Sequence, residues 1–276
     1  MARRFTVIQG GISDVPALET APTADAAWRV DLYRPGDVEA GTVAAWRALM
    51  ARSGVSDPLR DPDYLLPLAQ HRGRRVAVAL AWSRDAAGHE TLRGAVPLAM
   101  PHPVWGRGAE SWRTREAGLT ALIDGTAADA VETALRGRLR TLRRPVRLAG
   151  SFDDGRTSAP ERSALAPVRR PIPAGAFVGV RPEGWHVPEG VERVTLSEPT
   201  DVRDAVETLL ALDARTARAP IIADPSEATL VRVVSRLFAR RSACRVELVR
   251  RAGEVVAAAL HLGLGPASVT WRRARA

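Results

Sequence analysis

The sequence predicts an α/β protein with mixed sheets (α+β), built from two similar halves in tandem, of which the second is incomplete. The first observation is a repeated pattern: residues 61–100 and 224–271 each open with Asp-Pro, continue as a helix and end in two apolar strands joined by a polar turn. The second is size, because 276 residues favour about two domains and a hydrophobic content of 46% supplies their cores. Helix-plus-hairpin units are common, so chance recurrence in a chain with 20 prolines is the alternative to duplication.

The first half is expected over residues 27–180, after a loose leader at 1–26 that mixes Gly, Pro, Thr and Ala without periodicity. Apolar runs predict its strands, and apolar residues at helical spacing predict its helices. In chain order these elements are a strand at 28–33, a helix at 37–52, a helix capped by Asp61, strands at 75–82 and 92–100, an irregular strand at 111–123, a helix at 124–142, and strands at 145–150 and 176–180.

The second half is expected over residues 191–276, after a linker at 181–190 that is rich in Pro and Gly. Asp224 is an N-cap followed by proline, and Glu227 completes an approximate capping box three residues later. In chain order the expected elements are a strand at 191–196, a helix capped by Thr200 with Asp201 and Asp204 in its first turn, a loop at 214–224, the Asp224 helix, strands at 245–250 and 255–262, and the start of a third strand at 267–271. The chain ends five residues after Trp271.

Charge and composition narrow the class of protein. A formal charge of +9 and a pI near 11.2 are typical of nucleic-acid or membrane-surface binders, but all 40 basic residues are arginine. This bias, with abundant Ala, Gly and Pro, indicates a GC-rich genome rather than a nucleic-acid function. Five arginines between positions 136 and 144 lie on the helix at 124–142 or directly after it, without aromatic side chains to stack on bases, which favours a solvated face. The absence of lysine excludes Schiff-base chemistry and the P-loop lysine.

The single cysteine and the apolar windows bear on the compartment. Cys244 cannot form an intramolecular disulfide, which suits a reducing cytosol, and its place at the start of a strand favours a small buried residue over a nucleophile. No window approaches the ~20 apolar residues of a membrane span, and the first residues lack the apolar core of a signal peptide. We therefore expect a cytoplasmic protein without a membrane span.

The residues that carry a family resemblance are Trp46 with Leu49, Arg75-Val-Ala-Val-Ala-Leu with Gly94-Ala-Val-Pro-Leu, and residues 245–260 with Trp271. In these residues and in the order of its elements, the chain resembles the GNAT acyltransferase superfamily. Within it, the chain resembles the CelD-type proteins associated with cellulose biosynthesis, which are similar to two GNAT halves in tandem and distantly similar to Fem-type peptidoglycan aminoacyltransferases. The resemblance spans about residues 28–271 and is one of pattern rather than of a signature motif.

The resemblance implies acyl transfer from acetyl-CoA or another acyl-CoA to an amine or hydroxyl of a saccharide or peptide precursor, in envelope polysaccharide synthesis. It also implies a loop of the form Gln/Arg-x-x-Gly-x-Gly/Ala, whose backbone N–H groups bind the pyrophosphate of the donor at the start of a helix. Arg115 and Gly118 are the nearest match, with Thr120 in place of the second small residue. Gly125 and Thr126, at the start of the helix at 124–142, are the alternative anion site, although the neighbouring aspartate would repel phosphate.

For catalysis, His261 on the second hairpin is the candidate general base. Asp213 and Arg215, expected on the loop after the Thr200 helix, are candidates for contacting a substrate anion or carboxylate. The relatives carry His and Arg-Trp in that loop, where this chain has Asp213 and Arg215-Thr216. The alternative for His261 is a strand histidine with a structural role. The other histidines lack metal-ligand spacing, so no metal site is expected.

Two other classes of function remain open at this point. The second half ends before the donor loop and helix that the resemblance implies, so a non-catalytic remnant that serves as a binding or assembly module is the main alternative to an enzyme. An arginine-driven nucleic-acid or membrane-surface binder is the third. Under the first hypothesis the partners are a small-molecule donor and a saccharide or peptide acceptor, with no specific nucleic acid and no metal.

Overall fold

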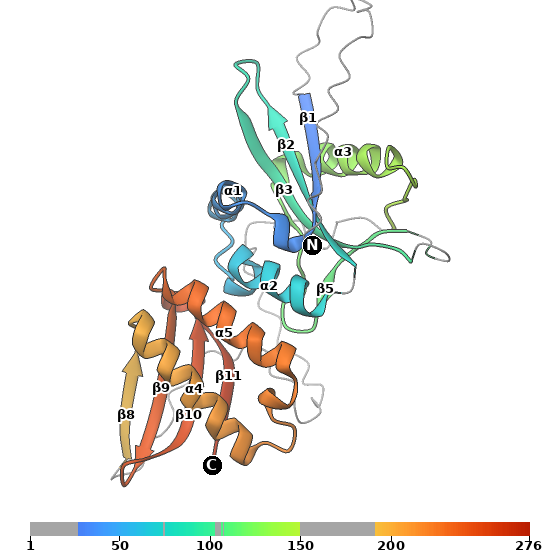
Figure 1. Cartoon of the computed structure of the whole chain (residues 1–276). Helices are drawn as coiled ribbons and strands as arrows, with labels where there is room; N and C mark the ends of the chain where they lie inside the picture. Colours follow the sequence, from blue (N-terminus) through green and yellow to red (C-terminus); the bar gives the residue numbers. More distant parts are fainter. Residues whose placement is uncertain (1–26, 74, 103–105, 107, 150–190) are drawn as a thin grey trace, which may run out of the picture.

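The computed structural model describes residues 27–73, 75–102, 106, 108–149 and 191–276. Within them the chain forms two separate antiparallel sheets and a short two-stranded ribbon, with helices against the sheets (Figure 1). This is the mixed α/β architecture that the sequence predicts. The expected leader at 1–26, the linker at 181–190 and the strand at 176–180 lie outside the described residues.

The first sheet has the strand order β1-β2-β3-β4, with β7 also paired to β3. Its strands are β1 (Ala27–Tyr33), β2 (Val76–Arg84), β3 (Glu90–Ala99), β4 (Glu110–Ser111) and β7 (Leu122–Ile123). The helices of this half are α1 (Ala40–Arg52), α2 (Pro62–Arg72) and α3 (Ala128–Arg140), with 3-10 turns η1 (Pro35–Asp37), η2 (Pro58–Arg60) and η3 (Gly125–Ala127).

The second sheet has the order β11-β10-β9-β8. Its strands are β8 (Val191–Leu196), β9 (Cys244–Arg251), β10 (Glu254–Leu262) and β11 (Val269–Arg275), and its helices are α4 (Pro199–Thr216) and α5 (Pro225–Ala239), with 3-10 turns η5 (Ile221–Ala223) and η6 (Gly265–Ala267). Each half therefore runs from a strand through two helices to an antiparallel hairpin, and then to further strand pairing beside the second strand of the hairpin. The strand and helix order of the first half thus recurs in the second.

The Asp-Pro helix starts are confirmed. The Asp61 side chain accepts from the Asp63 N–H at 2.8 Å, and the Asp224 side chain accepts from the N–H groups of Ser226 and Glu227 at 2.9 and 3.3 Å. These carboxylates satisfy N–H groups that the first helical turn leaves without backbone partners. The carboxylate of Glu227 does not complete a capping box, because it is bound by arginines from other elements.

Three local expectations are wrong. Thr200 does not cap α4, because the helix begins at Pro199 and Glu198 is its N-cap residue. The strand at 111–123 is divided into two-residue pieces, since the chain doubles back between β5 (Arg113–Thr114) and β6 (Gly118–Leu119), with Gly118 at a φ of 62° that glycine adopts without strain. The strand at 145–150 is reduced, within its described part, to an isolated bridge between Leu148 and Ala109.

The two faces of the first sheet are buried differently. One face packs on α3 through Val131, Leu135 and Leu139, which form an apolar stripe along that helix. The other face contributes Val78 and Leu80 to a larger cluster. That cluster also contains residues of α1, α2, α4, α5 and the second sheet, so the two halves share one hydrophobic core.

Helices α2 and α5, which occupy the same position in the two halves, pack antiparallel to each other. At one end, Asp61 before α2 accepts from Arg241, just beyond α5, at 3.0 Å. At the other end, Ser226 in the first turn of α5 donates to the backbone carbonyl of His71 in the last turn of α2 at 3.2 Å. Each helix thus starts beside the end of the other.

Candidate functional site

His261 lies on β10, on the face of the second sheet opposite α4 and α5. Leu260 and Leu262 belong to the core cluster with α4 and α5, and side chains alternate along a strand, so His261 points to the other side. It is nevertheless buried, with 2% of the residue exposed. A buried imidazole needs polar partners, and the neighbouring strands supply them.

The two ring nitrogens of His261 face different groups. Nε2 lies 3.5 Å from Oε2 of Glu247 on β9, and Nδ1 lies 3.2 Å from the hydroxyl of Thr270 on β11. Three adjacent strands therefore present a carboxylate, an imidazole and a hydroxyl in one row. A carboxylate beside one nitrogen leaves the other nitrogen available to take a proton, which is the arrangement of a general base.

Arginines surround this row. Arg193 donates to Oε2 of Glu247, and Nε of Arg245 lies 3.8 Å from Oε1 of the same carboxylate. Arg273 donates to the Thr270 hydroxyl at 3.3 Å. The side chains of Arg193 and Arg245 are each 35% exposed, so they form the rim between the buried row and solvent.

These charges set the protonation states of the pair. Burial lowers the pKa of His261, and Arg245 and Arg273 add to that effect, while Glu247 opposes it. Burial alone would raise the pKa of Glu247, but Arg193, His261 and Arg245 together hold it below its ordinary value. At neutral pH the row therefore contains an ionised carboxylate and a neutral imidazole.

Asp213 and Arg215 are not on a loop, because α4 continues to Thr216 and includes both in its last turn. Asp213 is buried, and its Oδ2 accepts from the N–H of Ile221 at 2.6 Å, which ties the end of α4 to the following turn. Since α4 covers the opposite face of the sheet, these residues do not join His261. The hydrogen bond to Ile221 gives Asp213 a structural role at the end of α4.

The expected donor residues Arg115 and Gly118 lie in the turn of the β5–β6 ribbon rather than at the start of a helix. Both are exposed, and no heavy atom lies within 4 Å of the position that a Cβ on Gly118 would take. Within the turn, the N–H of Ala117 is bound to the Thr114 hydroxyl at 2.8 Å, and Glu116 binds Arg72 at 3.2 Å. The turn therefore lacks the helix start that was expected beside it.

Gly125 and Thr126 form the 3-10 turn η3 immediately before α3. Oδ1 of Asp124 accepts from the backbone N–H of Thr126 at 3.1 Å and from its hydroxyl at 2.7 Å, and Oδ2 binds Arg93 at 2.8 Å. Burial opposes ionisation of Asp124, but the bonds from Thr126 and Arg93 outweigh it and lower the pKa. The carboxylate of Asp124 thus occupies both the N–H and the hydroxyl of Thr126.

A polar cluster that was not predicted from the sequence lies at the contact between the two halves. Glu227 in α5 binds Arg72 at the end of α2 and Arg272 on β11. Beside it, the rings of Tyr64 and Trp271 meet edge to face with centroids 5.6 Å apart, and Arg272 lies over the Trp271 ring at 4.5 Å. We call this set the seam cluster. The only signal in the sequence is Glu227 itself, which the capping-box pattern had already explained.

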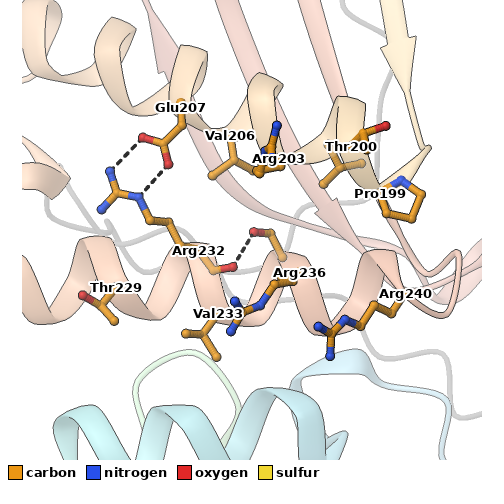
Figure 2. Close-up of a pocket in the computed structure, with 12 residues that line it drawn as sticks. Pro199, Thr200, Arg203, Val206, Glu207, Thr229, Arg232, Val233, Arg236 and Arg240 are labelled. Atoms are coloured by element: carbon orange, nitrogen blue, oxygen red, sulfur yellow. Dashed lines mark hydrogen bonds and ion pairs between the residues drawn. The ribbon is translucent and has the colours of Figure 1, made fainter.

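A groove of about 400 Å³ lies between α4 and α5 (Figure 2). These two helices cover the face of the second sheet opposite the His261 row. Valines of both helices line it, and arginines surround it. Arg232 and Glu207 form a two-bond ion pair across it at 2.6 and 2.8 Å. None of the candidate catalytic or donor-binding residues predicted from the sequence lines this groove.

Other site types receive no support in the described part of the chain. Cys244 is buried, and burial raises the pKa of its thiol to about 12, which fits the expected structural role. Among the described residues, no group of three or more His, Cys, Asp or Glu side chains is placed to hold a metal ion. In the same residues, no helix combines the length and apolarity needed to cross a membrane.

Comparison with models of known protein families and with curated proteins finds no match to this chain.

Proposed function

We propose that this chain is an acyltransferase-like protein of the GNAT superfamily, with GNAT-like halves at residues 27–180 and 191–276. It would act in the cytoplasm and transfer an acyl group from acetyl-CoA or another acyl-CoA to an amine or hydroxyl of a saccharide or peptide precursor used in envelope polysaccharide synthesis. The recurring strand and helix order and the antiparallel packing of α2 against α5 support the tandem arrangement. The substrate class rests on the family resemblance.

The observation that carries the proposal is the buried imidazole of His261, which lies between Glu247 and Thr270. Acyl transfer to an amine or hydroxyl requires removal of one proton from the nucleophile, and an imidazole with a lowered pKa is unprotonated at neutral pH and can accept it. The ionised Glu247 orients the ring and stabilises the imidazolium that forms. The arginines at the rim would attract an anionic group of either substrate.

The direct test is acetyl transfer by the purified chain. The chain is incubated with acetyl-CoA and with amino-sugar or peptide-amine acceptors, and acetylated acceptor is measured by mass spectrometry. We expect His261→Gln to slow the reaction about 10²–10⁴-fold, the usual contribution of a general base. His89→Gln, a substitution at a histidine whose side chain is 80% exposed, is the matched control and should retain full activity. An unchanged rate in His261→Gln would exclude His261 as the base.

A second candidate is a non-catalytic GNAT-fold module for binding or assembly. It is favoured by the geometry of the residues expected to bind the acyl-CoA donor. The Thr126 N–H is bound by Asp124, and the turn with Arg115 and Gly118 does not adjoin the start of a helix. Orphan N–H groups at a helix start supply much of the binding of a pyrophosphate. We therefore expect the 276-residue chain to bind acetyl-CoA only weakly, with a Kd above about 100 μM, or less than about 5.5 kcal/mol of binding free energy.

Isothermal titration with acetyl-CoA separates the two candidates. Micromolar binding would rule out the non-catalytic module, and its loss in Gly118→Asp would place the donor at the β5–β6 turn. A side chain at position 118 would meet open space, so this substitution tests the site, although the positive φ adds local strain. Gly253→Asp, at another glycine with a positive φ and open space around it, is the control for that strain.

A further inference from the structure

We propose that Thr270 is a nucleophile that carries the acyl group, so that transfer proceeds through an acyl-threonine ester. This inference rests on the proposed function, and it adds a covalent step and a residue that the sequence does not single out. Its basis is the row of Glu247, His261 and Thr270 on β9, β10 and β11. A nucleophile within reach of a base, with the base oriented by a third group, is the recurring arrangement of covalent catalysis.

A β-bulge creates the contact between the base and the hydroxyl. Leu260 pairs with Arg272, but the next residue, His261, pairs with Thr270, so β11 has one extra residue at this point. In a regular ladder Trp271 would stand opposite His261. The bulge instead puts the small hydroxyl there and turns Trp271 to the opposite face, where it packs on Tyr64. One irregularity thus builds the row and also completes the seam cluster.

The charges determine which nitrogen of His261 acts. A carboxylate can only accept hydrogen bonds, so Glu247, with Oε2 3.5 Å from Nε2, favours the tautomer of the neutral ring that carries its proton on Nε2. Nδ1 then has a free lone pair 3.2 Å from the Thr270 oxygen and accepts its proton. Arg273, which donates to the same oxygen at 3.3 Å, stabilises negative charge as it develops there.

The reaction balances with the donor and acceptor already proposed. Oγ1 of Thr270 attacks the thioester carbonyl while its proton moves to Nδ1 of His261. The carbon–sulfur bond breaks, and the leaving thiolate takes that proton, which yields the free thiol and an ester on Thr270. An amine or hydroxyl acceptor then attacks the ester carbonyl, gives its proton to His261, and the proton returns to the departing Thr270 oxygen.

The test uses p-nitrophenyl acetate, an activated ester that acylates nucleophiles without needing a CoA site. The full chain is mixed with the ester, quenched in acid, and its mass and peptide map are read by mass spectrometry, while nitrophenolate release is followed by absorbance. We expect one acetyl group on Thr270 and a burst of nitrophenolate. Thr270→Val, which keeps the shape and removes the hydroxyl, abolishes the adduct, and Thr270→Ser restores it. His261→Gln slows adduct formation about a hundredfold or more.

Thr195→Val is the control, because Thr195 is an exposed threonine on β8 of the same sheet, and it should label like the parent chain. Circular dichroism melting confirms that each variant is folded. Absence of an acetyl group from Thr270 in folded protein, or full labelling of Thr270→Ser with no dependence on His261, overturns the proposal. Acceptor acetylation that survives in Thr270→Val overturns it too, and leaves the acyltransferase function standing by direct transfer. An adduct on Thr270 that no amine or hydroxyl acceptor removes supports the nucleophile and contradicts the transferase.

Discussion

Removing the Glu227 carboxylate should destabilise the chain far more than removing a comparable carboxylate from the surface. Glu227 in the seam cluster binds Arg72 and Arg272, and its side chain is 9% exposed. Breaking a buried ion pair by removing one partner costs about 3–5 kcal/mol, because the other charge stays buried without compensation. The Arg272 side chain is 15% exposed and Arg72 is 40% exposed, so solvent screens one of the two. We therefore expect Glu227→Gln to lower the free energy of unfolding by about 3 kcal/mol, the lower end of that range.

The matched control is Glu207→Gln. Glu207 also binds an arginine, Arg232, through two hydrogen bonds, but the two side chains are 51% and 47% exposed (Figure 2). An exposed pair contributes about 0.2–1 kcal/mol. For a chain of this size each kcal/mol shifts the melting temperature by roughly 2–4 °C, so we expect a fall of roughly 6–12 °C for Glu227→Gln and less than about 4 °C for Glu207→Gln.

The assay is urea unfolding followed by circular dichroism, with the slope m checked for each variant so that only changes in stability are compared. Arg272→Ala should lower the free energy of unfolding more than Arg72→Ala does, because Arg272 is the more buried of the two arginines. Equal losses of unfolding free energy in Glu227→Gln and Glu207→Gln would refute the reasoning, since they would show that the seam cluster stabilises the chain no more than a surface ion pair does. A loss confined to one of two separate unfolding transitions would show that the halves unfold independently, against the shared core.

Three further predictions follow from burial and charge. Because burial lowers the pKa of His261, the unfolded chain binds a proton at this residue more readily than the folded chain does. The resulting contribution to stability is complete above the ordinary histidine pKa of about 6.5 and is lost as pH falls below it. We therefore expect the urea midpoint to depend less on pH between about pH 5 and 7 in His261→Gln than in the parent chain. Cys244, whose thiol has a pKa of about 12, should resist alkylation by iodoacetamide at pH 8 in the folded chain and react in urea, and rapid alkylation without denaturant would contradict its burial. The arginines between 136 and 144 should give duplex DNA only the non-specific Kd range of about 10⁻⁴–10⁻⁶ M at physiological salt, and nanomolar binding in a fluorescence anisotropy titration would show that the charge is functional.

The sequence alone determined the features that depend on near neighbours. Asp61 and Asp224 cap their helices because acceptor and donors are two or three residues apart. The hairpins β2–β3 and β9–β10 follow from continuous apolar runs and the polar turns between them. The sequence also places His261 on the second strand of the hairpin, and in the structure it lies on β10.

Local patterns misled where two neighbouring residues of one segment suit the same role. Thr200 is a good N-cap residue, but Pro199 also suits the first turn, and α4 begins with it. Asp213 and Arg215 were expected on a loop because helix ends are weakly marked in this sequence. The helix continues to Thr216, since Asp213 gains a hydrogen bond to Ile221 by remaining in it.

Only the tertiary structure decided the side-chain partners. Ser226 meets the carbonyl of His71 from 155 residues away, and Arg241 meets Asp61 from 180 residues away, so no local window contains either pair. The row of Glu247, His261 and Thr270 depends on one extra residue in β11, a register that is set by the pairing of whole strands. Burial then lowers the pKa of the His261 imidazole, which a sequence leaves at its ordinary value, because the desolvation that shifts it exists only once the sheet and the arginine rim have assembled.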